Sequence, residues 1–233
     1  RACPICAETK SNIIFHDHNR REGYSELEWD FVECISCKMR YLTNIPSFEE
    51  MWGKYTDIYV EPDIEKMKSQ LKSKGDIKPN GKKVLDIWCN FGTGLTSYYN
   101  TGWDVYGIDL NHKAIEDCKK YLWKDNFFCS TIEDADFGDG TFDRIQTYHV
   151  LEHIYEPKPF LKRCYDLLKD EGTLSIRVPH GRSLEMAVFS QYASQSWIPF
   201  HVNMFWKSNI IQILKEIWMK DIKVSTIPAP IWW

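Results

Sequence analysis

The sequence predicts an α/β protein, with a mostly parallel sheet, helices on both of its faces and a small four-cysteine domain in front. Strand-like apolar runs alternate with helix-like segments over residues 81–233, and this rhythm is typical of a parallel sheet. One run, residues 83–88, passes through a small-residue loop into a predicted helix, as in units that bring the backbone close to a nucleotide-like cofactor. Two Cys-x-x-Cys pairs before residue 45 indicate the small domain.

The composition is that of an ordinary globular protein, with 43% hydrophobic and 27% charged residues. The net charge of −4 offers no basic surface to a phosphate backbone, so we expect no nucleic-acid partner. No apolar run approaches the ~18 residues of a membrane-spanning helix, and no secretory signal is visible. We therefore expect a cytoplasmic protein without a membrane partner. The chain starts at Arg1 and its last residues look cut, so we expect the natural termini to lie outside it, and the oligomeric state stays open.

The four N-terminal cysteines predict a structural zinc site. Cys3 with Cys6, and Cys34 with Cys37, each offer two thiolates from one tight turn, and together they complete a closed tetrahedral site. The gap between the pairs exceeds the ~15–20 residues of the simplest pattern. It is long enough for a hairpin, and residues 28–33 alternate like a strand. A redox pair and disulfides are the alternatives. Because four ligands leave no open position, this zinc would stabilise the fold rather than take part in chemistry.

The other four cysteines, Cys89, Cys118, Cys129 and Cys164, are scattered through apolar or helical patterns. Scattered cysteines are mostly small buried hydrophobic residues. We expect that role here, and the mixture favours a reducing compartment over a disulfide framework.

Three domains are predicted: a zinc ribbon at 1–45, a helical connector or cap at 46–80, and the α/β domain at 81–233. In the connector, Ser47 and Glu50 form a predicted capping box that opens a short helix. A second helix is predicted to begin at Pro62. In the α/β domain we predict strands at 83–88, 104–109, 126–130, 143–148, 173–179 and 221–227, and helices at 92–100, 111–122, 157–169 and 207–218.

Ligands of parallel sheets bind at the carboxyl ends of the strands, so the residues that follow each strand are the functional candidates. Asp109 ends the second strand about 20 residues after Asp86, where dinucleotide-binding folds place the acid that bonds ribose hydroxyls. Four histidines fall at or beyond the ends of the fourth and fifth strands, namely His149, His153, His180 and His201.

Four motifs in order resemble class I S-adenosylmethionine-dependent methyltransferases, with their Rossmann-like sheet. They are VLDIWCNFG at 84–92, GID at 107–109, DGTFDRI at 139–145 and HVLEH at 149–153. FVEC at 31–34 and YLTN at 41–44 resemble the zinc-ribbon leader of some bacterial members, which include sugar methyltransferases.

The resemblance implies a cofactor site for S-adenosylmethionine. Asp86 and the loop that holds Trp88, Asn90 and Gly92 would lie against the methionine part of the cofactor, and Asp109 would accept hydrogen bonds from the ribose. Further along the chain, adenine would lie between Leu110 and Ile132, with Thr131 where the family often has an acid. The backbone near Tyr148 and His149 would meet the cofactor's amino group.

Trp88 and Asn90 depart from the family, which has glycine at both positions because a side chain there would enter the cofactor's space. Trp88 could turn away with the cofactor still bound, or stack on the sulfonium as a cation–π contact. It could also fill the site and leave an inactive scaffold. The retained Asp86, Gly92 and Asp109 favour binding.

The resemblance implies transfer of a methyl group to a hydroxyl, with a histidine as general base. His153 is the first candidate, His149 and His201 follow, and Glu152 would orient the base. The motif His149-x-x-Glu152-His153 also resembles the Glu-x-x-Glu-His metal motif of ubiquinone-biosynthesis and small-RNA methyltransferases. A second divalent metal is therefore the less favoured alternative, with His201 completing its site.

The expected substrate is a small molecule. Segment 180–206 is predicted to form the substrate wall, and the aromatic residues of 196–201 suit a polar ring such as a sugar or nucleotide-sugar. The alternative function is an inactive methyltransferase-like module for binding or assembly, with its cofactor site blocked by Trp88. Methylation of RNA or protein is a third hypothesis, which the net charge disfavours for RNA. The seventh, antiparallel strand of the family is absent or incomplete after residue 227.

Overall fold

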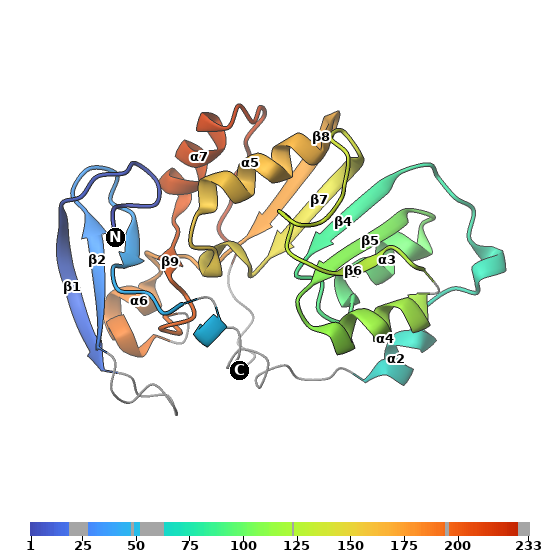
Figure 1. Cartoon of the computed structure of the whole chain (residues 1–233), viewed down its shortest axis with the longest axis horizontal. Helices are drawn as coiled ribbons and strands as arrows, with labels where there is room; N and C mark the ends of the chain where they lie inside the picture. The colour runs from blue at the N-terminus through green and yellow to red at the C-terminus, as the bar shows by residue number, and fades with distance from the viewer. Residues whose placement is uncertain (19–27, 48, 52–62, 123, 194–195, 228–233) are drawn as a thin grey trace. The chain divides into compact units, whose positions relative to one another are not determined.

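A computed structural model describes residues 1–18, 28–47, 49–51, 63–122, 124–193 and 196–227, and Figure 1 draws the rest in grey. The chain forms two compact units. The first comprises Arg1–Met51, Glu152–Lys158 and Val178–Trp233, and the second comprises Trp52–Leu151 and Pro159–Arg177. The predicted domain boundaries at residues 45 and 80 stay predictions. The first unit groups the N-terminal strands with the C-terminal part of the chain.

The second unit is built on five parallel strands in the order β6-β5-β4-β7-β8 (Figure 1). The strands are β4 (Lys83–Ile87), β5 (Asp104–Asp109), β6 (Phe127–Cys129), β7 (Phe142–Tyr148) and β8 (Leu168–Arg177). From β4 the chain adds strands first on one side and then on the other, so β4 and β7 flank a topological switch point. Ligands of open parallel sheets bind at such a point, beyond the carboxyl ends of the strands.

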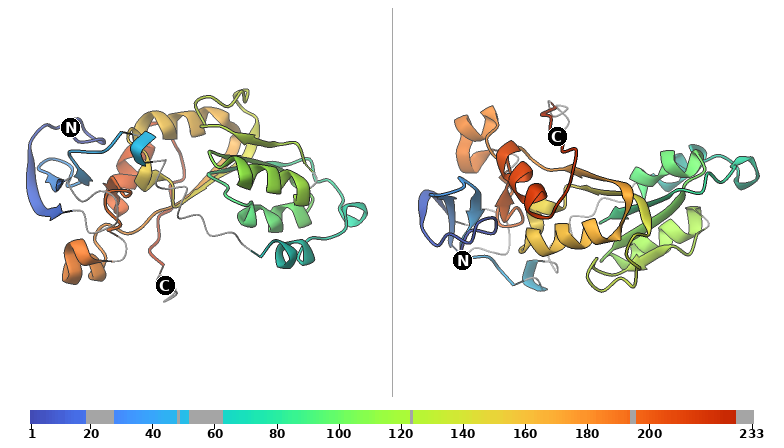
Figure 2. Two further views of the ribbon diagram at one scale, coloured as in Figure 1. Left: turned by 60° about the horizontal axis from the view of Figure 1, so that its bottom comes forward. Right: turned by 90° about the horizontal axis from the view of Figure 1, so that it is seen from above.

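The sheet is connected by helices, as the alternation predicts. η3 (Thr93–Leu95) and α3 (Thr96–Asn100) join β4 to β5, α4 (His112–Leu122) joins β5 to β6, and α5 (Pro157–Leu167) joins β7 to β8. Because parallel crossovers are right-handed, the reversal of direction at β4 places α5 on the face opposite α3 and α4. Figure 2 shows the green helices α3 and α4 beside β4 to β6 and the gold helix α5 beside β7 and β8.

The core between the sheet and helices α3 and α4 is apolar and includes two cysteines, Cys89 and Cys118. Cys164 is also buried, so the prediction of buried cysteines is confirmed for these three. It is wrong for Cys129, which is exposed. The reason is the position of β6 at the edge of the sheet, where two of its three side chains face solvent.

The first unit contains an antiparallel sheet in the order β1-β2-β3-β9. Its strands are β1 (Ser11–His18), β2 (Glu28–Cys34), β3 (Arg40–Leu42) and β9 (Asn203–Met204). The predicted strand at 28–33 is thus confirmed as β2. β9 brings a segment from far along the chain to the edge of the N-terminal hairpin. Arg1 strengthens this junction, because its guanidinium donates hydrogen bonds to Leu42 O at 2.8 Å, Val202 O at 2.9 Å and Asn203 Oδ1 at 2.9 Å.

The connector has the predicted capping box, since Ser47 N donates to Glu50 Oε2 at 2.9 Å and Glu50 N donates to Ser47 Oγ at 3.3 Å. Phe48 and Pro62 lie outside the described residues. Asp63 caps the next helix by accepting from Lys66 N at 3.0 Å. The remaining elements are α2 (Ile64–Ser69), η2 (Lys74–Asp76), η4 (Leu151–His153), α6 (Leu184–Phe189), η5 (Ser190–Tyr192) and α7 (Lys207–Glu216).

The predicted strand at 221–227 is wrong, because these residues form no strand. Their polar–apolar alternation leaves Ile222 and Val224 half-buried, but no neighbouring strand pairs with them in the described chain, and β8 ends the parallel sheet. Alternation alone does not supply a partner for the backbone groups of a strand. Within the described ranges, no helix combines the length and apolar character needed to cross a bilayer.

Candidate functional site

The loop after β4 has an unusual backbone. Trp88, Asn90 and Gly92 have φ angles of 56°, 48° and 71°, in the left-handed region that glycine adopts most readily. At Gly92 a Cβ atom would lie 2.6 Å from the Tyr121 hydroxyl, so a side chain there would displace a buried tyrosine. The two positions at which the resemblance predicts glycine are therefore left-handed positions, and Trp88 and Asn90 keep this backbone despite their side chains.

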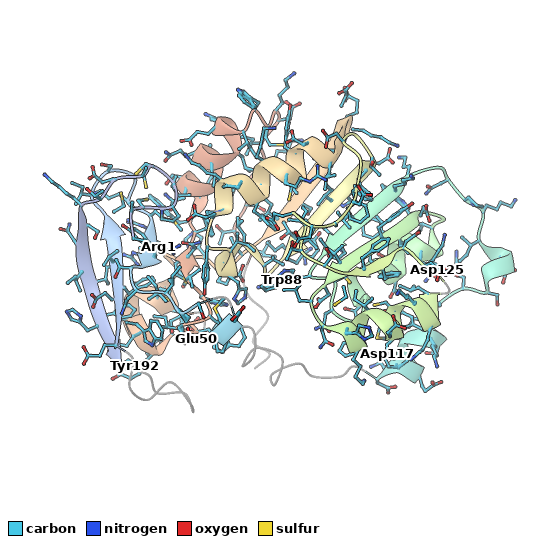
Figure 3. All side chains as sticks on the ribbon, viewed as in Figure 1. Arg1, Glu50, Trp88, Asp117, Asp125 and Tyr192 are labelled. Atoms are coloured by element: carbon cyan, nitrogen blue, oxygen red, sulfur yellow. The ribbon has the colours of Figure 1, made fainter. Side chains whose placement is uncertain are left out.

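Trp88 lies at the carboxyl end of β4 and is half-buried (Figure 3), whereas the side chain of Asn90 is exposed. The backbone N–H of Asn90 donates to Asp109 Oδ2 at 2.8 Å. This bond fixes the loop against the end of β5.

Asp109 is 1% exposed and holds two loops at once. Oδ2 accepts from Asn90 N, and Oδ1 accepts from Asn111 N at 2.8 Å. A carboxylate oxygen can accept more than one hydrogen bond. The arrangement is compatible with the predicted ribose contact, which would add donors to a carboxylate that is already oriented.

Asp86 is buried inside β4, where it is paired in register with Gln146 of β7. Burial raises the pKa of Asp86 to about 7, the charge of Asp109 acts in the same direction, and a hydrogen bond from Gln146 opposes them. A Cβ atom on Gly94 would lie 3.0 Å from both Asp86 Oδ2 and Gln146 Nε2, so the first turn after the loop packs directly on this pair. The sequence analysis did not identify Gln146, because its place opposite Asp86 follows only from the register of β7 against β4.

The predicted adenine region follows β5 and β6. Leu110 is half-buried and Ile132 is 2% exposed. Thr131 Oγ1 donates to Asp134 Oδ2 at 2.8 Å and accepts from Asp134 N at 3.2 Å. Its hydroxyl therefore caps a local turn.

Tyr148 is the last residue of β7, and His149 directly follows it. The Tyr148 hydroxyl lies 3.0 Å from Ser175 Oγ, and the Arg177 guanidinium lies 4.4 Å from the centre of its ring. His149 has a left-handed φ of 58°, an exposed side chain and a backbone N–H that donates to Arg177 O at 2.9 Å. Arg177, which the sequence reasoning also missed, thus orders the end of β7 from β8.

The residues predicted to bind the cofactor all lie in the second unit, at the carboxyl ends of four adjacent parallel strands. They are Asp86, Trp88, Asn90, Gly92, Asp109, Leu110, Thr131, Ile132, Tyr148 and His149. The catalytic candidates Glu152, His153 and His201 lie in the first unit, whereas His149 lies in the second.

Glu152, His153 and His201 form a buried cluster whose ligand atoms all lie within 4.8 Å of one another. His153 Nδ1 lies 2.9 Å from the carbonyl oxygen of Phe200. Because a carbonyl only accepts, Nδ1 carries the proton and Nε2 presents its lone pair in the neutral ring. His201 Nε2 lies 3.9 Å from Glu152 Oε1. The cluster can accept a proton or hold a divalent cation.

Trp197 forms an aromatic wall beside the histidines of this cluster. The centre of its ring lies 5.8 Å from that of His153, 5.3 Å from that of His201 and 4.8 Å from that of Phe200. Trp197 and Phe200 come from the segment predicted as substrate wall, 180–206, and they give the cluster an apolar lining.

The four N-terminal cysteines form a second cluster, with all four sulfur atoms within 4.8 Å of one another. Cys3 Sγ lies 3.4 Å from Cys37 Sγ, and Cys6 Sγ lies 3.5 Å from Cys34 Sγ. Tetrahedral zinc with bonds of ~2.3 Å needs sulfur–sulfur distances of about 3.8 Å, so the donor set fits zinc. The hydrogen bond between Cys3 and Cys37 lowers the pKa of Cys3 and raises the pKa of Cys37, so one thiolate shares the proton of its neighbour.

The two cysteine turns have the same backbone. Ala7 N donates to Cys3 O at 2.9 Å, and Lys38 N donates to Cys34 O at 3.2 Å. Ala7 and Lys38 have φ angles of 59° and 61°. Each pair is thus closed by a left-handed residue four positions after its first cysteine, and this backbone directs two thiols to one point.

Residues 85–176 match the family model described as a methyltransferase domain. The chain is 29% identical over 182 residues to the mitochondrial ubiquinone biosynthesis O-methyltransferase of Saccharomyces cerevisiae, covering 74% of this chain and 52% of that protein. It is 28% identical over 125 residues to the ubiquinone biosynthesis O-methyltransferase of Bradyrhizobium diazoefficiens, covering 51% of this chain and 49% of that protein. The chain thus spans about half the length of these two relatives.

The fold is also similar to that of a solved methyltransferase structure. The crystal structure of a SAM dependent methyltransferase from Archaeoglobus fulgidus is similar with a TM-score of 0.52 and 20% identity, covering 80% of this chain and 86% of that one. Residues 85–176 thus match a methyltransferase domain model, and the parallel sheet that they carry has the Rossmann-like fold of this methyltransferase structure.

Proposed function

We propose that this protein is an S-adenosylmethionine-dependent methyltransferase that acts on a hydroxyl group of a small molecule. One observation carries the proposal: the loop after β4 keeps three left-handed residues although two of them are not glycine. A left-handed residue with a side chain costs roughly 1–2 kcal/mol. Such strain persists only where the surroundings impose it, and here the bond from Asn90 N to Asp109 does so. The loop thus keeps a backbone suited to glycine, of the kind that lets a main chain approach a ligand closely.

The cofactor residues would act as the resemblance implies. Asp109 would accept hydrogen bonds from the ribose, and Leu110 and Ile132 would enclose the adenine. Asp86 and the 88–92 loop would lie against the methionine part. Trp88 would turn away from the cofactor or stack on its sulfonium.

Bound S-adenosylmethionine would supply a methyl group that is already activated by a sulfonium. The remaining task of the protein is to align the acceptor hydroxyl and remove its proton. His153 is suited to this task, because the Phe200 carbonyl fixes the proton on Nδ1 and makes Nε2 the basic nitrogen of the neutral ring. Glu152 would orient His201 as a second proton acceptor.

The hydroxyl as acceptor is supported by relatives named for O-methylation. Trp197 beside the two histidines suits a flat or ring-shaped acceptor, and a sugar or nucleotide-sugar is our proposed class. The carboxylate and the two imidazoles would also suit a divalent metal of borderline character. That metal would lower the pKa of the acceptor hydroxyl, and it is the alternative to a metal-free histidine base.

The N-terminal cysteines would hold a structural zinc ion. Their four sulfur atoms fit the size of a tetrahedral thiolate site, and four thiolates leave no position for a substrate. We propose that this ion stabilises the ribbon formed by β1, β2 and β3.

The second candidate function is an inactive binding or assembly module. The half-buried Trp88 at the end of β4 favours it, since a large ring there could occupy the place of the cofactor. The double substitution Trp88→Gly and Asn90→Gly distinguishes the two functions in a titration with S-adenosylmethionine. For an active enzyme, the wild type binds and the double variant gains less than about tenfold. For a blocked module, the wild type gives no signal and the double variant binds.

A further inference from the structure

A pocket of about 290 Å³ in the first unit lies apart from every residue assigned above to the cofactor, the histidine cluster or the zinc site. β1, β2 and β3 contribute to it from one side, and α6 with its flanking residues contributes from the other. Its apolar lining includes Phe15, Phe31 and Met186, each at most 9% exposed. Its charged lining consists of Arg40 and Arg182.

Glu33 holds the two guanidinium groups in place. Its Oε2 accepts from Arg40 Nε at 3.2 Å and from Arg182 Nη2 at 2.8 Å. Arg40 Nη1 also donates to Gly181 O at 3.2 Å, and the Arg182 guanidinium lies 4.2 Å from the ring centre of Trp206. Two guanidiniums around one carboxylate leave a net positive charge, and both are oriented before any ligand arrives.

Donors remain available at this pocket. Over the residues that the structure describes, no hydrogen bond involves Nη2 of Arg40 or Nη1 of Arg182. The two side chains are 22% and 32% exposed. A carboxylate or phosphate oxygen could therefore accept from either arginine without displacing Glu33.

Apolar side chains are exposed on the elements that line the pocket. On β1 the exposed fraction is 56% for Ile13 and 36% for Ile14, and on α6 and η5 the exposed residues are Leu184, Val188, Phe189 and Tyr192. Figure 3 labels Tyr192 at this end of the first unit. Exposed apolar groups around a pocket mark a surface that contacts an apolar partner. Of these residues Ile14 also lines the pocket, and an inorganic anion or a sugar phosphate bound there would leave its side chain in water.

We propose that this pocket binds an organic anion in which a carboxylate or phosphate is attached to an apolar group. Arg40 and Arg182 would take the anionic head, and Phe15, Phe31 and Met186 would enclose the apolar part. The proposal does not depend on methyl transfer, because none of its residues belongs to the cofactor or base sets. Arg182 and Met186 lie in segment 180–206, which the sequence predicts as the substrate wall, but the histidine cluster contributes nothing to this pocket.

The test is calorimetric titration of the full chain with three probes: 4-phenylbutyrate, the uncharged 4-phenyl-1-butanol and inorganic phosphate. The acid should bind at least about tenfold more tightly than the alcohol or the phosphate, which corresponds to roughly 1.4 kcal/mol. Equal binding of acid and alcohol, or no binding of the acid at about 10 mM, would overturn the proposal; the second limit lies at the weak end of measurable affinity.

Three variants locate the binding. Ala187→Trp fills the pocket from an exposed position without removing a charge and should weaken binding of the acid about tenfold or more. Arg182→Lys keeps the charge but loses the planar fork and should weaken it severalfold. Lys215→Met removes a charge from an exposed position on α7 and should leave the affinity unchanged. Thermal melting of each variant verifies folding. If 4-phenylbutyrate binds the Ala187→Trp variant as tightly as it binds the wild type, it binds outside this pocket and the proposal is wrong.

Discussion

At the scale of single residues, Asn90 is the clearest case of a side chain at a position suited to glycine. Its φ is 48° and its side chain is exposed, so its contribution is mainly conformational. Asparagine tolerates the left-handed region better than other residues with a Cβ. The bond from its N–H to Asp109 is independent of the side chain.

Asn90→Ala should therefore lower the free energy of unfolding by about 1 kcal/mol relative to Asn90→Gly. Urea denaturation of the two variants measures this difference directly. Equal stability of the alanine and glycine variants would show that the loop does not keep its left-handed backbone.

Asp86 predicts a pH dependence of stability. Burial raises its pKa in the folded protein to about 7 from an ordinary value of 3.8, so between these values the folded state binds more protons than the unfolded state. The contribution of the Asp86 carboxyl to the free energy of unfolding is fully present below pH ~4 and is lost as the pH rises to about 7. The loss is on the order of a few kcal/mol.

Asp86→Asn should remove this slope, as urea midpoints measured from pH 5 to about 8 would reveal. Asp125→Asn is the matched control, because Asp125 is exposed in the same unit and should keep the slope of the wild type. If wild type and Asp86→Asn show the same pH profile, the carboxyl of Asp86 is not held neutral by burial.

At the scale of elements, the two cysteine turns and the hairpin they close form one assembly. Cys34 is the last residue of β2, and Asn209 of α7 donates to Cys37 O at 3.0 Å. A zinc ion in this place would link the ends of the hairpin to α7.

Elemental analysis of the purified protein should find about one zinc ion per chain. Cys34→Ser should lose it and unfold at a lower temperature, because binding of a structural zinc ion is coupled to folding. Cys129→Ser, which changes an exposed cysteine far along the sequence, should keep the ion. A folded wild-type protein without metal would refute the zinc site.

At the scale of the whole molecule, local signals predicted the elements whose formation depends on nearby residues. The capping box at Ser47, the strand that contains Asp86 and the strand that ends at Asp109 were predicted in this way. Contacts between distant segments were not predicted, because they depend on tertiary packing. β9 pairs with β3 across most of the chain, and Gln146 gains its role only from the register of β7 against β4.

The same limit explains the two errors. Residues 221–227 have the alternation of a strand but no partner within the described chain, and Cys129 lies on an edge that the sequence did not identify. For the candidate site, the sequence indicated the cofactor residues by their places after the strands. It did not indicate that Trp88, Asn90 and His149 would all have left-handed backbones.

Binding of S-adenosylmethionine to the wild-type chain tests the central claim most directly. Calorimetric titration should give a dissociation constant below about 1 mM, within the usual range for enzyme ligands. Asp109→Asn should weaken binding at least about tenfold, because it removes the charge of the carboxylate that orders the loop and would accept from the ribose. Asp125→Asn should bind as the wild type does. No heat at millimolar ligand, or equal binding by the Asp109→Asn variant, would contradict the account.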